Sequence, residues 1–172
     1  MSDESEIDFD YMGALEPYFE LVQNEYNRER DRKQSLETRS GLIITVITAL
    51  FAFFVNKISI KEILEIFQCP LSFLSLLKIL SGIAVYISLL VCTWFSLKTI
   101  TTMQYSYFDI SVITLEKLRN PKNYEMIDIV NKYKNMLLNN IKINDKKASF
   151  LDFSIKSIIV CVLSSVIYIS VL

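Results

Sequence analysis

The stretch GLIITVITALFAFFV, residues 41–55, decides the fold. It belongs to an uncharged run from Ser40 to Asn56. A helix that crosses lipid must satisfy its backbone polar groups internally and keep charge out of the hydrocarbon, so such runs predict membrane spans. Two further runs qualify, Ile79–Leu97 and Ser157–Leu172, and Lys156 and Asp152 can snorkel and so lengthen the last one. The alternative, a buried helix of a soluble core, applies chiefly to the third run. We predict an all-α membrane protein with transmembrane helices at residues 40–57, 79–98 and 152–172.

The composition agrees and excludes several kinds of function. The chain is 52% hydrophobic with a mean hydropathy of +0.34, and its net charge of −1 offers no basic field for duplex nucleic acid. It has no histidine, which excludes His-based catalytic triads and zinc sites, and its 3 glycines cannot form a phosphate-binding glycine-rich loop. Serines and cysteines within lipid have no base to activate them. We therefore expect no enzyme, no cofactor and no metal.

Basic residues near the spans predict the orientation. Ten basic residues lie between the second and third spans and five lie before the first span, whereas the first loop contains three. Because cytoplasmic segments carry the excess of Lys and Arg, the N-terminus should be cytoplasmic and the C-terminus outside. The residues counted before the first span are Arg28, Arg30, Arg32, Lys33 and Arg39.

The segments around the spans are expected to be mostly helical. Residues 1–13 form an acidic tail, and a cytoplasmic amphipathic helix over residues 14–39 should begin near Pro17, a residue suited to a first turn. In the outer loop, residues 58–78, the sequence ISIKEILEIF predicts a short interfacial helix that ends before Pro70. The cytoplasmic segment, residues 99–151, should contain a helix over Tyr105–Leu118, a turn at Asn120-Pro121, and a helix from Tyr124 that runs into the last span.

Each span carries a stripe of small and hydroxylated residues on one side. Such stripes serve either helix packing in lipid or an aqueous path through an oligomer. We predict that the first stripe lines a pore, through Thr45, Thr48, Ala52 and Asn56. Three spans do not enclose a pore alone, so this hypothesis requires a homo-oligomer, and a tetramer is the assembly we favour. The absence of charge inside the spans argues against a transporter or pump. The stripes comprise Gly41, Thr45, Thr48, Ala52 and Asn56; Ser81, Ser88, Cys92 and Ser96; and Ser157, Cys161, Ser164 and Tyr168.

Two basic groups lie beside the predicted cytoplasmic face of the membrane. Arg28, Arg32 and Arg39 share one helical face, and guanidinium groups suit phosphate oxygens. Lys142 and Lys146 lie at the same membrane face, next to Lys147 and three asparagines. We predict that these five residues bind an anionic ligand such as a nucleotide. The alternative is a solvated, salt-bridged helix or contact with anionic lipid headgroups.

Two segments resemble known proteins. QSLETRSGLIITVITALFAFF, residues 34–54, is similar to the membrane-entry segment of prokaryotic anti-phage effectors, and NNIKINDKKASFLDFSIKSIIV, residues 139–160, is similar to the Lys-bearing helix before their final span. These effectors are the transmembrane proteins of Pycsar and CBASS systems, the SLATT-type membrane domains, and the membrane effector of the Hailong system.

The resemblance implies an oligomeric protein of the bacterial inner membrane that acts in abortive infection. Such a protein is paired with a nucleotidyltransferase or cyclase, and it depolarises the membrane when a nucleotide or oligonucleotide signal changes. The alternative is a non-conducting membrane scaffold whose cytoplasmic helices recruit a partner.

Overall fold

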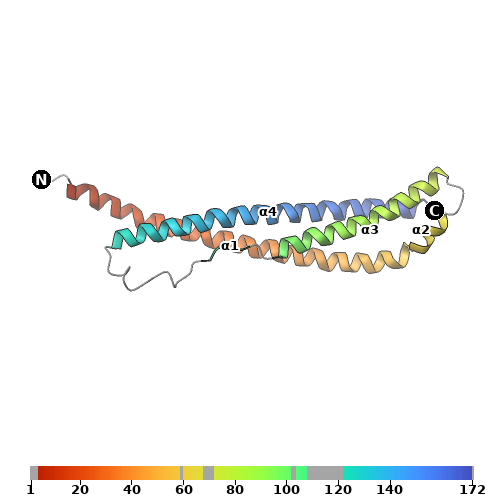
Figure 1. The fold of residues 1–172 in the computed structure, drawn as a ribbon, viewed down its shortest axis with the longest axis horizontal. Helices are drawn as coiled ribbons and strands as arrows, with labels where there is room; N and C mark the ends of the chain where they lie inside the picture. The colour runs from red at the N-terminus through yellow and green to blue at the C-terminus, as the bar shows by residue number, and fades with distance from the viewer. Residues whose placement is uncertain (1–3, 59, 68–71, 102–103, 108–121, 172) are drawn as a thin grey trace. The chain divides into compact units, whose positions relative to one another are not determined.

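The computed structural model describes residues 4–58, 60–67, 72–101, 104–107 and 122–171 (Figure 1). They form four helices, α1 (Glu4–Lys57), α2 (Ile60–Phe67), α3 (Phe73–Ile100) and α4 (Lys122–Ser170). Helices account for 94% of these residues, which include no strand. The predicted all-α fold is therefore confirmed.

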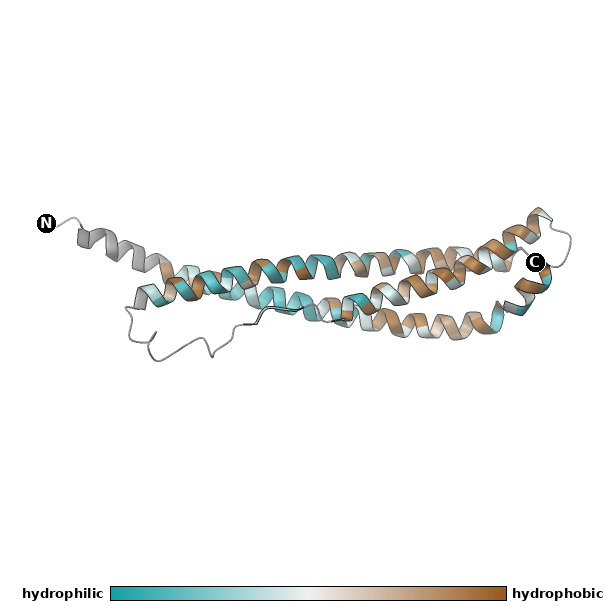
Figure 2. Cartoon of the chain, in the orientation of Figure 1, coloured by the Kyte–Doolittle hydropathy of each residue, from teal (hydrophilic) through white to brown (hydrophobic). Residues whose placement is uncertain are grey.

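Three helices, α1, α3 and α4, are long and apolar enough to cross a membrane. Figure 2 shows that hydrophobic residues gather in the C-terminal parts of α1 and α4 and along α3. These are the segments in which the uncharged runs predicted spans. The helices extend beyond the runs, because an uncharged run marks the hydrocarbon and not the end of the helix.

Helix α1 begins earlier than the sequence predicted. The expected start was near Pro17, after an acidic tail, whereas Pro17 lies inside a helix that starts at Glu4. A proline within a helix removes one backbone hydrogen bond and bends the helix, but it need not end it. The sequence also places acidic residues at this N-terminal end, which the helix macrodipole favours.

The segment between α3 and α4 also differs from the prediction. Residues 104–107 are not helical, although a helix was expected from Tyr105. The rest of that predicted helix and the turn at Asn120-Pro121 lie outside the described residues. The helix expected from Tyr124 is confirmed, since α4 continues without a break from Lys122 to Ser170.

The chain divides into two compact units, which share the long helices. Unit 1 comprises residues 1–34 and 102–145, and unit 2 comprises residues 35–101 and 146–172. In unit 1, the rings of Phe19 and Tyr26 pack edge-on against Tyr133, and Asn144 donates a hydrogen bond to Glu29. Residue numbers rise together along both helices in these pairs, so α1 and α4 are parallel in unit 1.

The inward residues of α1 and α4 follow alternating steps of three and four. This is the seven-residue spacing of coiled-coil seams, in which side chains interlock between neighbouring helices. In unit 1 the seam positions are Leu15, Phe19, Val22, Tyr26, Glu29 and Lys33 on α1, and Val130, Tyr133, Leu137, Asn140 and Asn144 on α4. In unit 2 they are Leu36, Ser40, Ile43, Ile47, Leu50 and Phe54 on α1, and Lys147, Leu151, Ser154, Ile158, Cys161, Ser165 and Tyr168 on α4.

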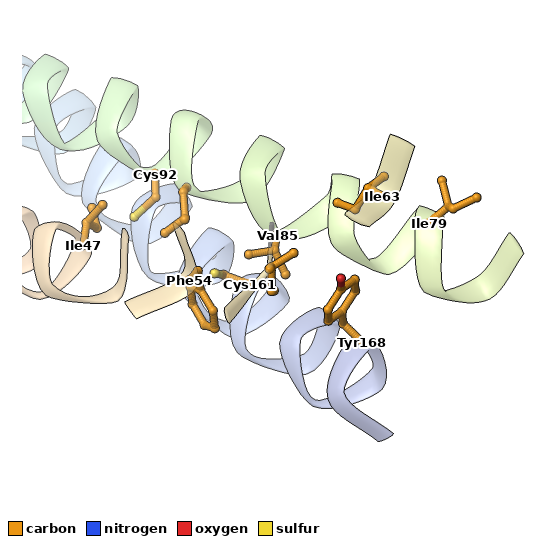
Figure 3. Close-up of a cluster of buried hydrophobic side chains, with 10 residues drawn as sticks. Ile47, Phe54, Ile63, Ile79, Val85, Cys92, Cys161 and Tyr168 are labelled. Atoms are coloured by element: carbon orange, nitrogen blue, oxygen red, sulfur yellow. The ribbon is translucent and has the colours of Figure 1, made fainter. Parts of the chain in front are cut away.

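Helix α2 packs against the core of unit 2. Ile63 of α2 is buried with Val85 of α3 and Tyr168 of α4 in one apolar cluster (Figure 3). Gly82 of α3 allows this close approach, because a Cβ atom there would lie 2.8 Å from Ile63 Cδ1 and 3.1 Å from Tyr168 Cε2. The predicted short helix is thus present, with one side packed on the protein and with Leu64 on its exposed side.

Enlarging Gly82 is expected to destabilise unit 2. Gly82→Leu should lower the free energy of unfolding by about 1–3 kcal/mol, because the added side chain must displace Ile63 and Tyr168. Gly41→Leu is the matched control, since nothing lies within 4 Å of a Cβ atom at that position. Thermal unfolding in detergent micelles checks the difference, and equal effects of the two variants would contradict the packing.

Candidate functional site

The polar stripes of α3 and α4 are used for packing inside unit 2. Ser96 Oγ donates to Ser154 Oγ at 3.1 Å, and the Cys92 thiol contacts the carbonyl of Ser154 at 3.1 Å. Ser40 of α1 joins them by donating to the Ser96 carbonyl at 3.0 Å. All four residues are buried. Small and hydroxylated residues therefore bring the three helices together here, as the packing interpretation expects. Of the other predicted stripe residues on these helices, Ser81, Ser88, Cys161 and Tyr168 are also buried, whereas Ser157 and Ser164 are only partly buried and lie outside the seam. Ser154 was not among the predicted stripe residues.

The stripe of α1 is not used in this way. The side chains of Thr45, Thr48, Ala52 and Asn56 are exposed in unit 2. Each polar member bonds to its own helix: Thr45 to the Gly41 carbonyl at 3.2 Å, Thr48 to that of Ile44 at 2.9 Å, and Asn56 to that of Ala52 at 3.1 Å. The side of α1 that meets the bundle carries Ser40, Ile47 and Phe54 instead. The four predicted pore-lining residues thus lie on one polar face that no part of the described chain covers; we call it the α1 polar face.

Two of the predicted ligand-binding arginines already have acidic partners. Arg28, whose side chain is 79% exposed, lies 3.5 Å from Glu25. Arg32 contacts Glu29 at 3.4 Å and Asp145 of α4 at 2.9 Å. The hydrogen bond to Asp145 raises the pKa of Arg32. These pairs fit the alternative interpretation of this face, a salt-bridged and solvated helix.

The other three predicted basic residues, Arg39, Lys142 and Lys146, are exposed. Their charged groups are accessible to an anion from solvent, and phosphate oxygens suit both guanidinium and ammonium groups. Neither unit contains all five predicted residues: Arg28, Arg32 and Lys142 belong to unit 1, and Arg39 and Lys146 belong to unit 2.

A buried ion pair in unit 2 was not predicted from the sequence. Lys147 is fully buried, and its ammonium group contacts a carboxylate oxygen of Glu37, whose side chain is 30% exposed. Lys147 was expected to lie in the same basic group as its exposed neighbours Lys142 and Lys146. The signal that identifies it is its place in the seven-residue spacing, between Asn144 and Leu151.

A polar layer in unit 1 was also missed. The Asn144 side-chain amide donates to the Glu29 carbonyl and to Glu29 Oε2, both at 2.7 Å. Next to it Tyr105 is 7% exposed, and Lys33 Nζ lies 4.7 Å from the centre of its ring. Burial raises the pKa of Tyr105 to about 12. The Tyr105 hydroxyl and Asn144 Oδ1 are buried and have no hydrogen-bond partner. Some of the buried polar atoms here therefore lack a hydrogen bond.

Within the described ranges, no cluster of three or more acidic or cysteine side chains is arranged to hold a metal ion. Comparison of the chain with protein-family models, with curated proteins and with solved structures finds no match in any of the three. A functional proposal therefore rests on the chemistry of the chain's own residues and on the patterns in its sequence.

Removing either partner of the buried ion pair should destabilise unit 2, and the loss should be larger when the carboxylate of Glu37 is removed than when the ammonium group of Lys147 is removed. Glu37→Gln is expected to lower the free energy of unfolding by about 3 kcal/mol or more, because it leaves the fully buried Lys147 ammonium unpaired. Lys147→Met should have a smaller effect, since the Glu37 carboxylate is partly exposed to water. The double variant should recover most of the loss. Chemical unfolding in detergent checks this order, and a double variant as unstable as Glu37→Gln would contradict it.

The raised pKa of Tyr105 predicts that unit 1 loses stability at alkaline pH. The pKa of Tyr105 in the folded chain is about 12, above its ordinary value of 10. The unfolded chain therefore loses this proton first, and the stability present below pH 10 is lost as the pH rises towards 12. Tyr105→Phe should be as stable as the parent at pH 7, because the hydroxyl lacks a partner, and more stable than it at pH 12. Unfolding measured at both pH values tests this, and parallel pH curves would refute it.

Proposed function

We propose that this chain is the membrane effector of a nucleotide-signalling anti-phage defence system. In this proposal it forms a homo-oligomeric ion channel in the bacterial inner membrane, with its N-terminus in the cytoplasm, and depolarises that membrane when its signal changes. The similarity of residues 34–54 and 139–160 to such effectors supports the biological setting. A nucleotidyltransferase or cyclase would supply the nucleotide or oligonucleotide signal.

The observation that carries the channel proposal is the α1 polar face. Most members of the polar stripes of α3 and α4 are buried, whereas Thr45, Thr48, Ala52 and Asn56 are exposed. Polar side chains at the depth of a membrane are favoured next to other protein or water over lipid. Several copies of the chain around a symmetry axis, four in the assembly we favour, would bring these faces together. Rings of hydroxyl and amide groups would then line an aqueous path.

The proposed ligand contacts are the basic residues outside the spans. Arg39, Lys142 and Lys146 are exposed and accessible to phosphate oxygens. Arg28 and Arg32 are in ion pairs with Glu25, Glu29 and Asp145, so a phosphate would have to replace these carboxylates. A ligand that binds the open and closed states with different affinity would shift the population between them.

A non-conducting scaffold is the second candidate. It is favoured by the bonds from Thr45, Thr48 and Asn56 to carbonyl groups of their own helix. These bonds lower the penalty for placing the three side chains against lipid or another helix, so water is not required. In this function the cytoplasmic helices would recruit a partner protein.

Ion flux through purified protein in liposomes tests the proposed channel. With 3′,5′-cyclic mononucleotides and cyclic dinucleotides as probes, one of them should change the flux at least tenfold. Asn56→Leu should reduce the flux several-fold, because it removes a polar group from the proposed path. Val55→Leu is the matched control, since Val55 is an exposed apolar neighbour.

The ligand contacts have their own variants in the same assay. Arg39→Glu and Lys146→Glu should weaken the nucleotide response, whereas Arg30→Glu, at an exposed residue outside the proposed set, should preserve it. No flux under any condition from intact oligomers would contradict the channel and favour the scaffold. Unchanged responses in both glutamate variants would contradict the proposed contacts.

A further inference from the structure

Residues Gln104–Tyr107 run outside the helices of unit 1, and hydrogen bonds tie them to α1 and α4. We call this segment the strap. Four hydrogen bonds between the strap and the helices α1 and α4 involve Ser106. The Ser106 N–H donates to Asn140 Oδ1 at 3.0 Å, and the Ser106 carbonyl accepts from Asn140 Nδ2 at 3.1 Å and from the Tyr26 hydroxyl at 3.1 Å. The backbone N–H and carbonyl of Ser106 thus connect both long helices.

Asn140 forms a two-ended pair with the strap. Its side chain is fully buried on α4, and both its acceptor and one of its donor hydrogens are used by Ser106. A buried amide without partners is strongly unfavourable, so Asn140 requires a backbone donor and a backbone acceptor at this position. The neighbouring Asn139 makes a different contact, from its exposed amide to Ser106 Oγ at 2.8 Å.

Outside Ser106, the strap contacts α1 through Lys33, whose Nζ donates to the Tyr107 hydroxyl at 3.1 Å and lies over the Tyr105 ring. Gln104 is exposed and Tyr107 is 63% exposed, whereas Tyr105 is buried with a hydroxyl that lacks a partner. Asn144 and Glu29 occupy seam positions nearby. In a stable coiled coil these inward positions are usually apolar. The association of α1 with α4 in unit 1 therefore includes polar side chains at seam positions, and the strap supplies the hydrogen-bond partners of one of them, Asn140.

We propose that the strap is a releasable clamp, which holds α1 and α4 of unit 1 together through the pairing of Asn140 with Ser106. Regulation of the channel by release of this clamp rests on the function proposed above. Because the partners of Asn140 come from a short segment, unit 1 has two discrete arrangements. In one the strap is docked on Asn140, and in the other it is released. Binding of a ligand that prefers one of them would shift the population accordingly.

Hydrogen exchange of the full-length chain in detergent tests the clamp directly. Peptides that contain Ser106 should be protected in the parent protein, because its N–H is bonded to Asn140. Asn140→Ala should accelerate this exchange at least tenfold, and Tyr26→Phe should accelerate it less, since it removes one of the two bonds to the carbonyl. Asn139→Ala is the matched control and should leave the exchange within threefold of the parent.

If Asn140→Ala misfolds, hydrogen exchange becomes faster throughout α4. The exchange of the Ser106 peptides in Tyr26→Phe is then the deciding measurement. Unprotected Ser106 peptides in the parent, or equal exchange in the parent and in well-folded Asn140→Ala and Tyr26→Phe variants, would overturn the clamp. In the liposome assay, Asn140→Ala should change nucleotide-independent flux at least tenfold relative to Asn139→Ala. Faster exchange with unchanged flux would overturn the regulatory role and leave the channel standing. Absence of flux from the parent would contradict the channel, while hydrogen exchange still decides whether the clamp exists.

Discussion

The inward seam between α1 and α4 is the constraint on which the rest of the structure depends. Side chains at alternating steps of three and four meet in both units, and their character changes along the helices. In the apolar part of unit 2 the layers contain Ile47 and Cys161, together with serines that allow close helix approach. Outside the predicted spans, the layers contain the Glu37–Lys147 ion pair and the Asn144–Glu29 hydrogen bonds. Polar layers of this kind specify which helices pair, at some expense in stability.

The seam also explains why three similar stripes have different surroundings. Ser40 lies at a seam position, and its hydroxyl bonds to the Ser96 carbonyl. Gly41, one residue later, points about 100° away from it, and Thr45, Thr48 and Asn56 follow on that side. The α1 polar face is thus outward because the seven-residue spacing places Ile47 and Phe54 inward. On α4 the same spacing places Ser154, Cys161 and Ser165 inward, and on α3 the stripe residues are buried.

Properties that depend on local composition could be predicted from the sequence, and those that depend on a partner helix could not. Uncharged runs predicted the apolar parts of α1, α3 and α4, since lipid excludes charge wherever a helix crosses it. Lys147 resembled its exposed neighbours, because only the opposing Glu37 makes its burial tolerable. Tyr105 has a helix-compatible sequence around it, yet the strap follows the bonds that Asn140 offers to Ser106. The seven-residue spacing was present in the sequence and places Glu29, Asn144 and Lys147 at inward positions, but it does not include Glu37, the partner of Lys147.

The proposed channel requires that the α1 polar face meets water. Accessibility of single cysteines placed along residues 42–56, in a chain whose native cysteines are replaced by alanine, tests this claim most directly. The account predicts that a charged, water-soluble thiol reagent modifies cysteines at positions 45, 48, 52 and 56 in liposomes. Cysteines at the seam positions 47 and 54, and at the apolar exposed positions 42 and 46, should stay unmodified. Uniform protection of all these positions, or modification without helical periodicity, would contradict the account.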